Sequence, residues 1–215
     1  MSDAGEIVAA GYDAMADRFA AWQRQIGGMS GRERVERLLP LMPDEPDVLE
    51  LGVGAGVEAS QLLAERGRLT GVDVSGEQLR RARERLPGAT LIHGDFLAVD
   101  FRAASFDAVV AIYVLNHVPR DRHRELLGRL AGWLRPGGYF YGSFGATNNP
   151  DWRGEWLGVA MFFSGHLPEV TRHLLGEAGL ELVEDEMETI QEPEGEVDFL
   201  WVLARRPAER DAGRG

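Results

Sequence analysis

The spacing of hydrophobic positions changes near residue 47 of the chain. Before it, Met15, Phe19 and Trp22 recur at helical spacing, and Val35 and Leu38 mark a second helix that ends in a proline-rich break. After it, short and nearly continuous apolar runs alternate with segments of helical period. This alternation predicts strands at 47–52, 69–74, 90–96, 106–115 and 137–145, with helices at 57–67, 76–86 and 121–134 between them.

The pattern changes again after residue 145. No regular period is apparent over 145–165, which predicts an irregular loop, and a helix is expected at 168–179. Two final strands, 180–188 and 196–206, are separated by the turn-rich EPEGE. This link is too short for a helical crossover, so the last strand should run antiparallel to its neighbours. The predicted fold class is α/β: a Rossmann-like, doubly wound, seven-stranded and mostly parallel sheet with helices on both faces.

A single domain accounts for the whole pattern, because 215 residues of which 44% are hydrophobic are sufficient for one full core. We divide it into an N-terminal helical lid (1–42), a cofactor-binding half (47–145), a substrate loop (146–165) and a C-terminal helix with a hairpin (166–206). The sequence has no run of 18 apolar residues, and acidic residues occur early. A soluble, cytoplasmic protein without a membrane partner is therefore expected.

Charge and composition exclude several classes of function. A net charge of −12 argues against binding to nucleic acid, whose phosphates require a basic surface. The absence of cysteine excludes disulfides and thiolate zinc sites, and the spacing of the histidines and acids gives no support for a metal site. All 23 basic residues are arginine, so a lysine Schiff base and a phosphate-loop lysine are excluded as well.

The first strand ends in a glycine-rich turn, VLELGVGAG. Its glycines follow the pattern G-x-G-x-G, whereas the dinucleotide fingerprint G-x-G-x-x-G/A needs a small residue where Val57 stands. Glu50 lies beside the turn, where a carboxylate would repel a pyrophosphate but suits a cationic ligand. The turn therefore favours a cofactor other than a dinucleotide.

Acidic residues also stand at the ends of the next two strands. Asp73, in GVDVS, is placed to bind two ribose hydroxyls, although it could instead cap the following helix. Asp95, in HGDF, can accept a hydrogen bond from an adenine amine with Phe96 alongside. The order of these features along the chain favours a nucleoside-containing cofactor.

These motifs, together with FDAVVAIYVLNHVP and LRPGGYFYGSF, resemble the class I S-adenosylmethionine-dependent methyltransferases of the bacterial small-molecule type. The resemblance covers about Val48 to Arg205, although the family often has Asp and Cys where this chain has Glu50 and Val53. It implies S-adenosylmethionine as the cofactor and an N-terminal lid whose Tyr12 covers it. The implied cofactor-binding residues are Tyr12, Glu50, Gly52, Val53, Gly54, Gly56, Asp73, Val74, Gln78, Asp95, Phe96, Ile112 and His117.

Two histidines are candidate catalytic bases. His117 follows the fourth strand at the edge of the sheet where ligands bind, although it could equally belong to the wall of the cofactor pocket. His166 ends the irregular segment, where it could instead be a capping or surface residue. His93 is expected to pack at the end of the third strand, and His123 and His173 to be solvated.

The segment 146–165 is rich in large side chains with interleaved charges, the composition of a small-molecule pocket. The alternative is that its aromatic residues pin a long connection onto the sheet. The expected substrate-binding residues are Trp152, Glu155, Trp156, Met161, Phe162 and Phe163.

The favoured function is methyl transfer to an oxygen or nitrogen, less favourably a carbon, of a small organic molecule such as a specialised metabolite. One alternative is a non-methylating reaction such as a cyclisation by an S-adenosylmethionine-binding enzyme of the same fold. A second is a nucleotide-dependent oxidoreductase. The substrate is expected to be a small molecule, and the sequence leaves the oligomeric state open.

Overall fold

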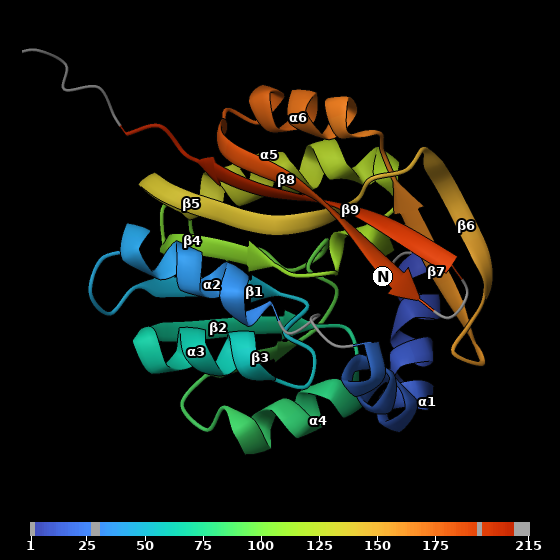
Figure 1. Ribbon diagram of the computed structural model, residues 1–215. Coiled ribbons are helices and arrows are strands. Elements are labelled where there is room, and N and C mark those ends of the chain that lie inside the picture. Colours follow the sequence, from blue (N-terminus) through green and yellow to red (C-terminus); the bar gives the residue numbers. More distant parts are fainter. Residues whose placement is uncertain (1–2, 27–30, 193–194, 209–215) are drawn as a thin grey trace, which may run out of the picture.

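The computed structural model describes residues 3–26, 31–192 and 195–208. Its centre is a seven-stranded sheet with the order β3-β2-β1-β4-β5-β9-β8 (Figure 1). The strands of this sheet are β1 (Asp47–Leu51), β2 (Arg68–Asp73), β3 (Thr90–His93), β4 (Phe106–Ala111), β5 (Leu134–Gly145), β8 (Glu181–Glu192) and β9 (Gly195–Arg205). The first five pair in parallel, and β9 runs antiparallel to both β5 and β8. The predicted fold class, with its reversed last strand, is confirmed.

Helices cover both faces of the sheet (Figure 1). On one face lie α2 (Arg32–Leu38), α3 (Glu58–Arg66) and α4 (Gly76–Arg85), and on the other α5 (His123–Trp133) and α6 (Pro168–Glu177). Three short 3-10 helices are η1 (Leu39–Leu41), η2 (Leu115–His117) and η3 (Arg120–Arg122). No helix in the described ranges is both long and apolar enough to cross a membrane.

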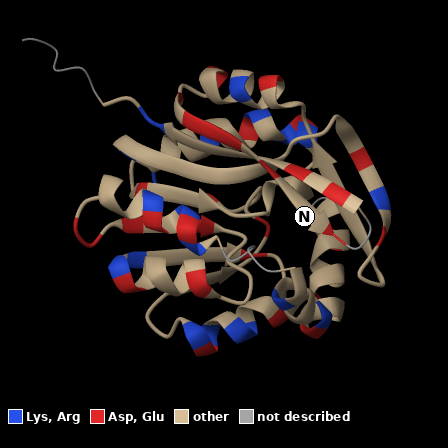
Figure 2. Cartoon of the chain, viewed as in Figure 1, with Lys and Arg blue, Asp and Glu red and all other residues tan. Residues whose placement is uncertain are grey.

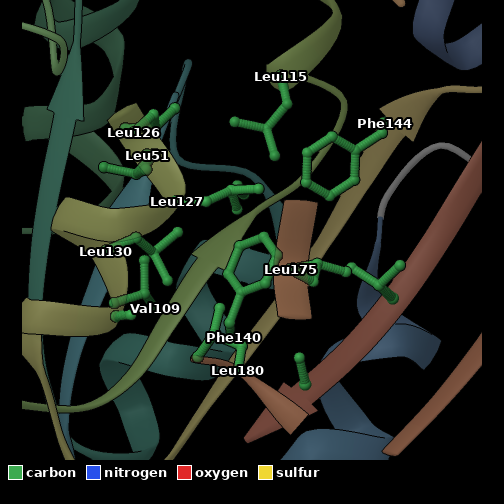
Figure 3. Close-up of a cluster of buried hydrophobic side chains, with 14 of the residues drawn as sticks. Leu51, Val109, Leu115, Leu126, Leu127, Leu130, Phe140, Phe144, Leu175 and Leu180 are labelled. Carbon is green, nitrogen blue, oxygen red and sulfur yellow. The ribbon is translucent and has the colours of Figure 1, made fainter. Parts of the chain in front are cut away.

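The central strands are buried on both faces, which explains their nearly continuous apolar sequences. On β4, Val109 and Ala111 join the core under α5 and α6, whereas Ala108 and Val110 join the core under α2, α3 and α4. This alternation follows from the two-residue period of a strand. Figure 3 shows the first of these cores, in which Phe140 of β5 packs among leucines of α5 and α6. The two cores together fix the sheet whose edge carries the site.

The segment after β5 is not the irregular loop that the sequence predicts. It forms an antiparallel hairpin, β6 (Asn149–Trp156) and β7 (Val159–Gly165), which makes a second sheet. Leu157 and Gly158 both have positive φ in the two-residue turn, the geometry of a tight hairpin. Leucine is rare in a turn position with positive φ, and charged side chains interrupt the alternation of apolar and polar residues along β6. The hairpin therefore could not be predicted from the sequence pattern.

The first helix, α1 (Asp3–Ile26), packs against β7 and α4 beside the carboxyl edge of the main sheet (Figure 1). Val8 and Met15 of α1 are buried with Met161 and Phe162 of β7. At the other contact, the Asp13 carboxylate accepts a hydrogen bond of 2.6 Å from Ser75 Oγ, at the start of α4. The helix and the hairpin together enclose one side of the site.

Candidate functional site

A pocket opens at the carboxyl ends of β1, β2, β3 and β4. Its walls are the glycine-rich turn after β1, residues that follow β2 and β3, the segment 112–119 after β4, and one face of α1. Ligands of open α/β sheets bind at this edge, where the strand order reverses. The sheet order β3-β2-β1-β4 places that reversal between β1 and β4.

The predicted cofactor-binding residues line this pocket with one exception, Gly56. A Cβ atom on Gly56 would lie 2.7 Å from Leu86 Cδ1, so this glycine lets the turn pack closely against the end of α4. Gly54 also has positive φ, but nothing lies within 4 Å of where its Cβ would be. The two glycines therefore differ in role: Gly54 leaves the backbone open to the pocket, and Gly56 serves packing.

Asp73 is held at the end of β2 by two backbone donors. Its Oδ2 accepts a hydrogen bond of 2.8 Å from Gly54 N–H, and its Oδ1 accepts one of 2.9 Å from Ser75 N–H. Burial of the side chain raises the pKa of Asp73. Ser75, not Asp73, caps α4, because Ser75 Oγ accepts from Gln78 N–H. The alternative role of Asp73 as a helix cap is therefore excluded.

Glu50 presents a buried carboxylate to the pocket. It is 4% exposed, and its Oε1 accepts a hydrogen bond of 2.9 Å from Ser60 Oγ. Its Oε2 has no hydrogen-bond partner within the described part of the chain, and neither does Nε2 of the buried Gln78. Burial, with a smaller contribution from Asp73, raises the pKa of Glu50 to about 8. Buried polar atoms almost always have a hydrogen-bond partner. We therefore expect polar groups of a bound ligand to contact these two atoms.

The start of α3 completes this end of the pocket. Its N-cap residue, Val57, lines the pocket and provides no side-chain hydrogen bond to the first turn. The free N–H groups of a helix start attract an anionic group. Together with Glu50, this arrangement fits the ammonium and carboxylate groups of an amino-acid moiety.

On the part of the pocket wall formed by α1 and the segment 112–119, His117 of η2 contacts Tyr12 of α1. Tyr12 Oη lies 2.9 Å from His117 Nε2, and His117 Nδ1 lies 2.9 Å from the Phe162 carbonyl oxygen. A carbonyl oxygen only accepts, so Nδ1 carries the proton and the Nε2 lone pair accepts from the Tyr12 hydroxyl. Burial lowers the pKa of His117 to about 4 and raises that of Tyr12. The imidazole is therefore neutral near pH 7 and has one basic nitrogen at the pocket wall.

The remaining histidines lie outside this pocket. His166 Nε2 is 3.2 Å from the Arg120 carbonyl oxygen, and its ring packs against His123. His123, expected to be solvated, is only 2% exposed, because the first residue of α5 faces the sheet.

His173 is exposed, as predicted. His93, at the end of β3, is exposed and contacts the Val74 carbonyl oxygen. Among the candidate bases, the geometry favours His117.

None of the expected substrate-binding residues lines the pocket: Trp152, Glu155, Trp156, Met161, Phe162 and Phe163. Met161 and Phe162 are buried against α1, and Trp156 packs on Phe19 and Trp22. The Phe163 ring centroid lies 4.8 Å from that of His117. Trp156, Met161, Phe162 and Phe163 therefore support α1 and His117, whereas Trp152 and Glu155 are exposed. Direct contact of these residues with a substrate stays a prediction.

Several lining residues have no clear signal in the sequence. Phe19 and Gln23 reach the pocket from α1, and Tyr113 reaches it from the segment after β4. Tyr113 has φ of 50°, a strained conformation for a tyrosine. It is held by a hydrogen bond of 2.7 Å from its N–H to Ser143 Oγ and by one of 2.6 Å from its hydroxyl to Glu188. Only the helical period of α1 could have pointed to Phe19, and it does not show which partner the helix faces.

Comparison with known sequences finds similarity to methyltransferases in the part of the chain that carries the site. Residues 48–138 match a family model described as a methyltransferase domain. The chain is 37% identical over 93 residues to an uncharacterized methyltransferase of Mycobacterium tuberculosis, covering 42% of this chain and 46% of that protein. It is 41% identical over 106 residues to a trans-aconitate 2-methyltransferase of Rhodopseudomonas palustris, covering 47% and 40%. The chain thus spans about half the length of the curated relatives it matches.

Comparison with solved structures shows a shared fold over nearly the full chain. The 1,6-didemethyltoxoflavin-N1-methyltransferase of Burkholderia thailandensis, solved with 1,6-didemethyltoxoflavin and S-adenosylhomocysteine, gives a TM-score of 0.60 at 18% identity. The match covers 93% of this chain and 91% of that chain. At this identity the likeness is one of fold.

Proposed function

We propose that the protein transfers a methyl group from S-adenosylmethionine to an oxygen or nitrogen of a small organic molecule. The proposal is supported by the match of residues 48–138 to a methyltransferase domain model and by the fold shared with S-adenosylmethionine-dependent methyltransferases. The enzyme class and the cofactor expected from the sequence are those of the family. The two alternatives, a cyclisation and a nucleotide-dependent oxidation, have no support from the relatives.

One observation carries the proposal: the unpartnered Glu50 Oε2 at the wall of the pocket. A cationic donor is the ligand that such a buried carboxylate favours, and the α-ammonium group of S-adenosylmethionine is one. The start of α3 would then hold the α-carboxylate, Asp73 the ribose hydroxyls, and Asp95 with Phe96 the adenine. S-adenosylmethionine, when bound there, supplies an electrophilic methyl group on a positively charged sulfur.

The protein must also position the acceptor nucleophile and remove one proton from it. An O–H or N–H nucleophile at the α1 end of the pocket donates its hydrogen bond to Tyr12 Oη. As the proton leaves the nucleophile for Tyr12, the hydroxyl proton of Tyr12 passes to His117 Nε2. The resulting imidazolium keeps its Nδ1–H on the Phe162 carbonyl, and its low pKa returns the proton to solvent afterwards.

Exclusion of water depends on α1 and its supports. The Asp13 carboxylate accepts both from Ser75 Oγ at 2.6 Å and from Glu77 N–H at 3.0 Å, which ties α1 to the start of α4. The hairpin β6–β7 packs on another face of α1. An enclosed site strengthens the hydrogen bonds within it and keeps water from competing as a nucleophile.

The proposal is tested by calorimetric titration of the protein with S-adenosylhomocysteine, S-adenosylmethionine and NAD in parallel. We expect the two sulfur ligands to bind and NAD not to bind. Small acceptors are then incubated with S-adenosylmethionine, and a product heavier by one CH₂ is expected. Binding of NAD alone would overturn the cofactor assignment, and a product of unchanged mass would favour the cyclisation.

A further inference from the structure

The pocket wall has two chemically different regions, which we call its cofactor end and its acceptor end. The acidic residues that line it, Glu50, Asp73 and Asp95, all lie at the ends of β1, β2 and β3. The end formed by α1 and the segment 112–119 is instead lined mainly by apolar side chains, among them Val8, Phe19, Val114 and Pro119. Its polar groups are uncharged near pH 7: Tyr12, Gln23, Tyr113 and the neutral His117.

No arginine lines the described pocket, and the whole sequence has no lysine. In Figure 2 the basic positions lie mainly on the covering helices and on β6. Four arginines adjoin pocket residues. Arg18 and Arg24, next to Phe19 and Gln23 on α1, are exposed to solvent and do not line the pocket. The other two side chains are bonded elsewhere. Arg85 Nη1 donates to the Ala55 carbonyl oxygen at 2.7 Å, and Arg120 Nη1 donates to Asn148 Oδ1 at 2.7 Å. An anionic ligand would therefore find no counter-charge in the wall.

We propose that the acceptor is an uncharged, largely apolar molecule with an O–H or N–H nucleophile, and that the pocket rejects acceptors that carry a carboxylate or phosphate. This inference rests on the proposed methyl transfer. A buried anion without a partner is strongly disfavoured. The chain thus differs in its acceptor from its relative that acts on trans-aconitate, a tricarboxylate.

A cationic acceptor fits the α1 end no better. The acids of the pocket are at the cofactor end, where the charges of S-adenosylmethionine engage them. The hydroxyl proton of Tyr12 is donated to His117, which leaves the Tyr12 oxygen as an acceptor for a neutral O–H or N–H group. A protonated amine also lacks the lone pair that attacks the methyl group. The geometry therefore selects a neutral nucleophile.

The test compares two ring probes of nearly equal size, 2-naphthol and 6-hydroxy-2-naphthoic acid, by calorimetry at pH 7.5. S-adenosylhomocysteine is titrated first, and each probe is then added to the saturated protein. We expect the naphthol to bind at least about tenfold more tightly than the carboxylate. Equal or tighter binding of the carboxylate overturns the inference, and so does failure of the naphthol to bind.

A pair of variants on α1 tests the electrostatic cause. Gln23→Arg places a cation in the acceptor wall, whereas Ala21→Arg adds the same charge at an exposed position of the same helix. We expect Gln23→Arg to tighten binding of the hydroxynaphthoate about tenfold, and Ala21→Arg to leave it unchanged. If Gln23→Arg keeps the wild-type preference for 2-naphthol over 6-hydroxy-2-naphthoic acid, the electrostatic explanation is wrong. Absence of S-adenosylhomocysteine binding to the wild type would instead contradict the proposed function itself.

Discussion

The two ends of the pocket are built in different ways. At the cofactor end, Glu50, Asp73 and Asp95 each stand at the end of a strand, and local turns fix their side chains. At the acceptor end, Tyr12 and His117 are 105 residues apart in sequence, and both depend on a hairpin that lies elsewhere in the chain. The cofactor end is therefore formed by residues of short contiguous motifs. The acceptor end is formed by residues that are distant in sequence and that folding brings together.

The largest expected effect is at the cofactor end, from Asp73→Ala. This change removes the acceptor of the Gly54 and Ser75 N–H groups and the proposed acceptor of the ribose hydroxyls. Each charge-assisted hydrogen bond contributes about 1.5–3 kcal/mol, so affinity for S-adenosylhomocysteine should fall more than about 100-fold. Calorimetry measures the loss, and circular dichroism checks that the fold is retained.

Asp44→Ala is the matched control, because the Asp44 side chain is exposed and pairs only at the surface with Arg66. It should leave the affinity for S-adenosylhomocysteine unchanged. Wild-type affinity in Asp73→Ala would contradict the assignment of the cofactor end.

The acceptor end is expected to govern turnover instead of cofactor affinity. His117→Asn removes the basic nitrogen, so kcat should fall by about 10²–10⁴ while S-adenosylhomocysteine affinity changes little. Because the folded-state pKa of His117 is about 4, wild-type turnover should be flat between pH 6 and 8 and should fall as the pH approaches 4. Methylated product is measured by mass, and the imidazole pKa by NMR titration.

His166→Ala is the control for this prediction. The His166 side chain lies outside the pocket and contacts the Arg120 carbonyl oxygen. Its removal should leave kcat within a few-fold of the wild type. Equal losses of kcat in the two variants would contradict the assignment of proton removal to His117.

The contrast between the cofactor end and the acceptor end also explains which parts of the fold and of the site could be predicted from the sequence. The sheet, its reversed last strand and the strand-end acids follow from apolar period and turn composition, which act over a few residues. The hairpin β6–β7 and the burial of His123 do not, because they depend on which surface each element meets. Phe162 illustrates the difference: its ring was expected at the substrate, but its carbonyl oxygen fixes the tautomer of His117.

Glu50→Gln should produce opposite effects on stability and on binding. Folding raises the pKa of Glu50 from 4.5 to about 8, so the folded state is favoured below pH 4.5 and loses stability as pH rises toward 8. Glutamine removes this dependence, and at pH 8.5 we expect the unliganded variant to be about 1–3 kcal/mol more stable. Affinity for S-adenosylhomocysteine should fall about tenfold.

Urea unfolding between pH 5 and 8.5 tests the stability of this variant, and calorimetry tests its binding. A variant that is less stable than the wild type at pH 8.5 would show that the Glu50 carboxylate is satisfied within the protein. The cofactor end would then lose the feature that most distinguishes it from the acceptor end.

The smallest expected effect comes from Arg153→Ala, which removes the ion pair between β6 and Asp3 of α1. Both side chains are largely exposed, so the free energy of unfolding should fall by less than about 1 kcal/mol, and less in high salt. The packing of Trp156 on Phe19 and Trp22 persists in this variant and should hold α1 against the hairpin β6–β7. Urea unfolding and the affinity for 2-naphthol measure the effect. A loss of several kcal/mol, or of naphthol binding, would mean that charge and not aromatic packing assembles the acceptor end.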